Sequence, residues 1–125
     1  MKNNGNIARI EACEFTKNNS TNDGGAIEND GTITSITNCH FTENDATDGG
    51  AVCEKGDNTM YISCIFSKNQ AFGEGTGDGW GGAVFIGGKT IQMVDCVFSE
   101  NEADDGGAIC IQGENNTVST APGPN

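Results

Sequence analysis

The chain has 125 residues, which allow one domain, and an apolar fraction of 34% would make a conventional globular core thin. Eighteen acidic residues outnumber six lysines and arginines, so the formal net charge is −12. This charge disfavours nucleic acid and anionic membranes as partners, and no apolar run approaches the roughly 20 residues that a membrane helix needs. No apolar signal-peptide core follows the first six residues, so we expect any export signal to lie outside this sequence.

A pattern that begins near the N-terminus occurs four times. In each copy a Cys is followed two residues later by Phe, three residues after that by Asn, and then by a Gly-Gly-Ala-Ile/Val box. The next Cys always lies fourteen positions after the second Gly of a box. The repeat period of 25 or 26 residues, extended once to 32, lies in the range of solenoid repeats.

The apolar residues of each copy predict strands rather than helices. They form short runs with a period of two, such as residues 64–66 and 84–86, separated by Gly, Asn, Asp and Ser. Three short strands and three turns in about 25 residues are typical of one coil of a parallel β-helix, whose coils stack about 4.8 Å apart. We therefore predict a single all-β domain over residues 1–125, a parallel β-helix with coils near 5–30, 31–55, 56–87 and 88–112. A partial fifth coil and a tail follow at 113–125, with Val118 and Ala121 continuing the columns of Met93 and Cys96.

Equivalent residues of successive coils are expected to form columns. Cys and Phe lie two apart on one strand and should face inward together, while the Asn carboxamides should donate hydrogen bonds to one another along a turn. We expect the stacked Cys side chains to be packed thiols, and Cys53 and Cys110, two coils apart, to be too distant for a disulfide. The three columns are Cys13, Cys39, Cys64 and Cys96; Phe15, Phe41, Phe66 and Phe98; and Asn18, Asn44, Asn69 and Asn101.

The segment from Phe72 to Trp80 is the one irregular piece of the repeat. It places nine residues where the other copies have two or three, and it contains the only Trp. Because loops on a rigid scaffold often carry binding residues, and because flanking glycines let an aromatic ring lie exposed, we interpret Phe72, Glu74, Asp78 and Trp80 as candidate binding residues. We expect this segment to be a solvated loop without a cofactor, with Glu74 and Asp78 as weak candidate calcium ligands as the alternative.

The acidic residues raise the question of catalysis. An aspartate directly precedes the Gly-Gly box in three copies: Asp23, Asp48 and Asp105. In the third copy Trp80 occupies this position. Capping of turns by Asp explains this column without catalysis. The only arginine, Arg9, lies at one end of the stack, so no acid, base and positioning group can be assembled and no catalytic residue is predicted. The single histidine, His40, and the lack of a Cys-x-x-Cys motif give no indication of zinc.

The alternation of two short motifs is specific. Phe-x-x-Asn begins at Phe15, Phe41, Phe66 and Phe98, and Gly-Gly-Ala-Ile/Val begins at Gly24, Gly49, Gly81 and Gly106. Over about residues 5–121 these motifs resemble the repeats of the chlamydial polymorphic outer-membrane proteins and related adhesin-like proteins. The resemblance implies a right-handed parallel β-helix at the cell surface or outside the cell, with the repeat pair taking part in adhesion.

From these observations we predict a non-enzymatic, adhesin-like repeat module that is secreted or displayed at the cell surface. Its expected partner is a protein or glycan of a host or neighbouring cell. One alternative is a structural β-helix whose copies stack end to end into fibres. A second alternative is a β-helix enzyme acting on polysaccharides. Neither nucleic-acid binding nor membrane insertion by this segment is expected.

Overall fold

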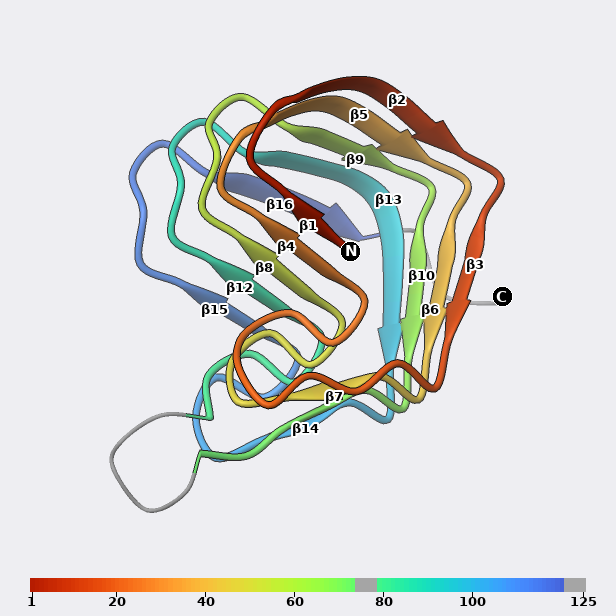
Figure 1. Cartoon of the computed structure of the whole chain (residues 1–125), viewed down its shortest axis with the longest axis vertical. Coiled ribbons are helices and arrows are strands. Elements are labelled where there is room, and N and C mark those ends of the chain that lie inside the picture. The colour runs from red at the N-terminus through yellow and green to blue at the C-terminus, as the bar shows by residue number, and fades with distance from the viewer. Residues whose placement is uncertain (74–78, 121–125) are drawn as a thin grey trace.

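The computed structural model describes residues 1–73 and 79–120, and within these ranges it contains sixteen β-strands and no helix. Every strand pairing in the described part of the chain is parallel. Successive coils lie on one another, so that equivalent strands run side by side (Figure 1). The predicted all-β parallel β-helix is confirmed.

Each coil contributes strands to the same faces of the solenoid. The first sheet has the order β1 (Lys2–Asn3), β4 (Ile27–Asn29), β8 (Val52–Glu54), β12 (Val84–Ile86) and β15 (Ile109–Ile111). A second face contains β2 (Asn6–Glu11), β5 (Thr32–Thr37), β9 (Met60–Ile62), β13 (Gln92–Ser99) and β16 (Thr117–Thr120). The long β13 continues around a corner onto a third face, where it pairs with β10 (Ile65–Ser67) beside β6 (His40–Thr42) and β3 (Glu14–Thr16). A short sheet follows, made of β7 (Asp45–Ala46), β11 (Gln70–Ala71) and β14 (Glu102–Ala103).

The pairing register follows the sequence repeat. Phe66 pairs with Phe41 on one side and Phe98 on the other, as the motif alignment predicts. Stacking begins earlier than the expected first coil, because β1 already pairs with β4. At the other end Val118 pairs with Met93 as predicted, but a register shift within β13 pairs Cys96 with Thr120 instead of Ala121. Thr120 thus takes the place beside Cys96 that was predicted for Ala121, which itself lies outside the described residues, because β13 holds one residue more than β16 over this stretch.

Two corners of each coil are formed by single residues in the left-handed region of φ. Such a residue redirects the chain abruptly, so the strand before it and the strand after it can lie on different faces. None of these residues is Gly, and only Asn38 and Asp95 are of a type that favours the left-handed region, so the sequence contains little indication of these corners. The first corner is formed by Ala12, Asn38, Ser63 and Asp95, and the second by Lys17, Glu43, Lys68 and Glu100, with φ between 52° and 57°.

The core is one continuous cluster inside the coils. The Cys and Phe columns face it as predicted: in the middle coils Cys39, Cys64, Phe41 and Phe66 are fully buried. Cys13 keeps the geometry of the column, because its Sγ donates to the carbonyl two residues earlier as the buried members do, but it is exposed because the strand that follows it, β3, is the edge strand of its sheet. The boxes need Gly for close packing between coils, since a Cβ at Gly50 would collide with backbone carbonyls of the next coil.

Candidate functional site

The insertion of the third coil leaves the stack after Phe72 and returns to it at Trp80. Phe72 is 44% exposed, whereas Trp80 is half-buried and stacks on Phe85 of β12, with ring centroids 5.9 Å apart. The predicted exposed Trp ring is thus corrected: the indole is half-buried because it lies against the ring of Phe85, which is itself only 7% exposed. Glu74 and Asp78 lie outside the described residues, and the binding and calcium predictions made for them lie there too.

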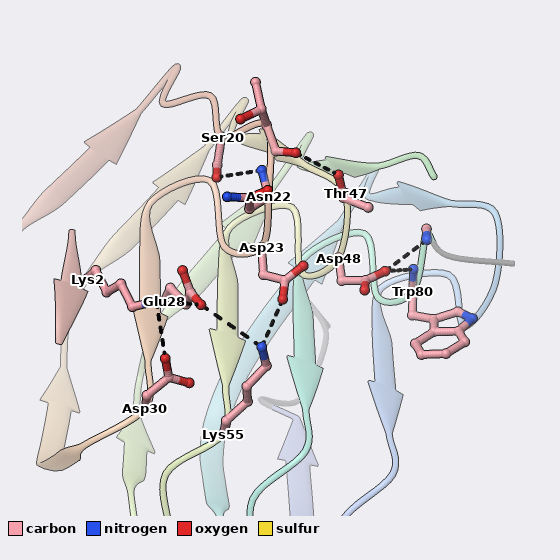
Figure 2. Close-up of polar contacts among 12 residues, drawn as sticks. Lys2, Ser20, Asn22, Asp23, Glu28, Asp30, Thr47, Asp48, Lys55 and Trp80 are labelled. Carbon is pink, nitrogen blue, oxygen red and sulfur yellow. Dashed lines mark hydrogen bonds and ion pairs between the residues drawn. The ribbon is translucent and has the colours of Figure 1, made fainter. Parts of the chain in front are cut away.

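Two carboxylates from neighbouring coils hold the ends of the insertion. Asp48, from the preceding coil, accepts hydrogen bonds from the backbone N–H groups of Gly79 and Trp80 at 2.8 and 2.9 Å, as Figure 2 shows. Asp104, from the following coil, accepts one from the N–H of Gly73 at 3.0 Å. The predicted role of Asp48 as a cap of a turn is confirmed, but the turn that it caps is that of the next coil and not its own. Asp104 was not predicted; its only sequence signal is the second Asp in the fourth copy.

Asp23, the first of the aspartates that precede a Gly-Gly box, belongs to a surface ion-pair network (Figure 2). The Lys55 ammonium lies 2.9 Å from Asp23 and 4.0 Å from Glu28, and Lys2 lies 3.3 Å from Glu28 and 3.4 Å from Asp30. The hydrogen bond with Asp23 raises the pKa of Lys55. These side chains keep partial contact with water, so each pair adds little stability. We read the network as a structural tie between the first coils.

An open groove runs along the corner between the third face and the short sheet. Its first part has a volume of about 980 Å³ and a second part has about 880 Å³; they share Asn19 and Asp45, and we call the two together the lateral groove. One wall of the first part is the left-handed corner row of Lys17, Glu43, Lys68 and Glu100. The other wall is the row Asn19, Asp45, Gln70 and Glu102, whose members pair in register. The second part is lined by polar turn residues and by Phe72.

The Asn column lies between the two walls and is hydrogen-bonded as predicted. The Nδ2 of Asn18, Asn44 and Asn69 donates to the Oδ1 of the next Asn at 2.9 to 3.0 Å. The same Oδ1 atoms also accept the backbone N–H of the preceding Asn, and Nδ2 of Asn44 donates in addition to the carbonyl of Phe15. Every donor and acceptor of the Asn44 side chain is therefore used within the fold, which makes the floor of the groove rigid.

The thiols form a column of packed side chains. All six cysteines are free. In the buried column each sulfur approaches a backbone carbonyl of the preceding coil, with Cys64 Sγ donating to Ile36 O at 3.3 Å. Cys53 and Cys110 both pair with Phe85 from opposite sides, so they lie two coils apart as predicted. Cys53 is nevertheless fully buried, and burial raises the pKa of its thiol.

A buried carboxylate, missed by the sequence analysis, lies inside the second coil. Glu54 is fully buried and accepts hydrogen bonds from the Tyr61 hydroxyl at 2.7 Å, from Asn29 Nδ2 at 2.6 Å and from the backbone N–H of Gly56 at 2.9 Å. Burial raises the pKa of this carboxyl, and the three donors oppose the shift. The available sequence signal was its place two residues after the inward Val52. Its hydrogen bonds to three segments indicate a structural role.

No group of three or more His, Cys, Asp and Glu side chains in residues 1–73 and 79–120 is placed to hold a metal ion. Within the same residues we find no helix with the length and apolar character needed to cross a membrane.

Parallel coils, in-register ladders of Cys, Phe and Asn, and a glycine box in each turn define the class of protein: a β-solenoid built from a sequence repeat of about 25 residues. A family model described as the Chlamydia polymorphic membrane protein repeat matches residues 12–30, 63–87 and 95–112. These three stretches of the chain are repeats of that family. The family and the solenoid fold together fit a surface repeat module. Neither a curated protein nor a solved structure matches the chain.

Proposed function

We propose that this chain is a non-enzymatic, adhesin-like module displayed at the cell surface or secreted, which binds a protein or glycan of another cell. The observation that carries the proposal is the fixed base of the insertion. A seven-residue extension is not needed for stacking, since the second and fourth copies turn with two residues in the same place. Its two ends are nevertheless held by Asp48 and Asp104, beside the exposed ring of Phe72.

The acidic residues support a non-enzymatic role because the structure uses them within the fold. Asp48 caps a turn, Asp23 forms an ion pair and Glu54 is sealed in the core with its hydrogen bonds satisfied. Arg9 lies 3.4 Å from Glu11, and both side chains are exposed. Neither is therefore placed in a cleft as a general acid or base would be. The repeat family, whose description is that of a membrane protein, supports location at the cell surface.

A deletion variant tests the proposal. Removing residues 73–79 joins Phe72 to Trp80 and gives the third coil the same turn length as the second and fourth. We expect the far-ultraviolet circular dichroism spectrum to keep its β character, while binding of the fluorescently labelled protein to cultured epithelial cells falls several-fold. Thr34→Ala, an exposed change on another face, is the control and should leave cell binding unchanged.

Asp104→Ala is the finer test, because it removes one support of the insertion and leaves the insertion itself in place. A partial loss of cell binding is expected, with the fold retained. If the folded deletion variant binds cells as the parent does, the insertion is not the binding element and the proposal is wrong in its central point.

A further inference from the structure

We infer that the lateral groove is a binding site for a neutral oligosaccharide, and this inference rests on the proposed function as a binding module. The groove is open, polar and long enough to cross all four coils, from Lys17 and Asn19 in the first to Glu100 and Glu102 in the fourth. Its volume of about 980 Å³ in the first part and 880 Å³ in the second falls in or near the range of ligand pockets.

The walls present unused hydrogen-bonding groups of both kinds. The side chains of Glu43, Gln70 and Glu102 make no hydrogen bond to any residue that the structure describes, and the Lys68 to Glu100 approach is long at 4.0 Å. Along the corner row, ammonium donors alternate with carboxylate acceptors at the coil spacing, roughly 4.8 Å. A sugar hydroxyl both donates and accepts, so a chain of hydroxyls can satisfy such alternating walls.

The floor between the walls favours a ligand that needs little rearrangement of the protein. In the middle coils the Asn ladder uses its own donors and acceptors completely, at Asn44 and Asn69, so there it holds both rows at fixed positions without competing for the ligand. Preorganised groups lose less conformational entropy on binding, which favours weakly binding polar ligands in particular.

The second part of the groove supplies the apolar contact that a sugar ring requires. Phe72 is exposed there, beside the hydroxyl and amide groups of Ser20, Asn22 and Thr47. Figure 2 shows Ser20, Asn22 and Thr47 on adjacent turns. One aromatic face among polar groups suits the apolar face of a pyranose ring. A protein partner would need a larger apolar centre than a single ring, because protein interfaces bury aromatic and aliphatic clusters.

Charge decides which class of saccharide fits. The two walls contain two lysines and four carboxylates, in a protein with a net charge of −12. Sulfated, uronic or sialylated chains would be repelled by this surface. A basic peptide would be attracted, but it would bind through charge and its affinity would fall steeply with salt. A neutral saccharide would bind with little dependence on salt.

The test is isothermal titration calorimetry, which measures the affinity of the full chain for three neutral hexasaccharides: cellohexaose, chitohexaose and maltohexaose. Polygalacturonate and heparin hexasaccharides are the anionic comparison, and an oligolysine peptide is the cationic one. We expect at least one neutral hexasaccharide to bind, with an affinity unchanged between low salt and roughly 0.5 M NaCl, and no binding of the anionic chains. Failure of all three neutral chains to bind overturns the inference. Binding of oligolysine alone overturns it too, and indicates a cationic partner instead.

Variants locate the site. The double change Gln70→Ala with Phe72→Ala should weaken the affinity for the saccharide by about tenfold or more. Gln92→Ala removes the same kind of exposed strand side chain outside the groove and should have no effect. Equal affinities of the two variants would overturn the assignment to this groove. The variant lacking residues 73–79 separates the two proposals, since retained saccharide binding with lost cell binding supports both the groove and the insertion. If the double variant loses saccharide binding but adheres to cells as the parent does, the groove is a saccharide site that does not serve adhesion.

Discussion

Removal of one ring from the phenylalanine stack is the most direct perturbation of the fold. The Phe41 ring is fully buried and lies between those of Phe15 and Phe66, with centroid distances of 4.8 and 4.7 Å and interplanar angles of 4° and 5°. Phe41→Ala therefore removes a complete buried side chain and two stacked pairs, and leaves a cavity inside a stack that is fixed by backbone hydrogen bonds on both sides.

The expected loss can be estimated from these contacts. Truncation of a buried Phe costs about 3–5 kcal/mol, and each aromatic pair contributes about 0.5–1.5 kcal/mol beyond area burial. Because the register on both sides prevents the neighbouring coils from closing the cavity, we expect a loss near the upper end, about 4–5 kcal/mol. That is a large part of the roughly 5–15 kcal/mol that stabilises a typical domain.

Phe98→Ala is the matched control. Phe98 occupies the same column two coils away, but it is half-buried and stacks on Phe66 alone among the described aromatic rings, at 5.0 Å. Its loss should be about half as large. Urea unfolding is measured by circular dichroism and by Trp80 fluorescence, because a solenoid can unfold in parts and two coincident probes are needed to justify a two-state free energy. Equal losses in the two variants, or a loss below about 1 kcal/mol for Phe41→Ala, would refute the inward stacking as the source of stability.

Two further predictions concern buried ionisable groups. Because burial raises the pKa of Glu54 in the folded state, the folded protein binds this proton more tightly than the unfolded chain; its contribution to stability is full at acid pH and is lost as pH rises through the folded pKa. Glu54→Gln should therefore be more stable than the parent in urea at neutral pH, with the difference disappearing as the pH is lowered; a difference independent of pH would contradict this. In the native protein, iodoacetamide labelling followed by mass spectrometry should modify the exposed Cys13 first and the buried Cys53 only after unfolding. Modification of Cys53 ahead of Cys13 would show that the Cys53 thiol is not buried in solution.

The sequence by itself determined the repeat, and with it the architecture. Constant spacing between Gly boxes and Cys residues requires equivalent residues to meet in successive coils, so the pairing of Phe66 with Phe41 and Phe98 and the Asn ladder could be predicted before any coordinates. Each of these contacts depends only on position within the period, because neighbouring coils are the only partners that a solenoid coil has.

Contacts that depend on a particular coil were decided by the tertiary structure. Trp80 was expected to be exposed because its neighbours are glycines, yet Phe85 of the next strand stacks on it. Cys13 follows the motif but is exposed. Residues that only the fold brings together, such as Asp104 with the insertion and Glu54 with Tyr61, have no common period to reveal them. A repeat specifies what is equal in every coil, while a site arises where one coil differs from its neighbours, and which groups then meet is set by packing across the stack.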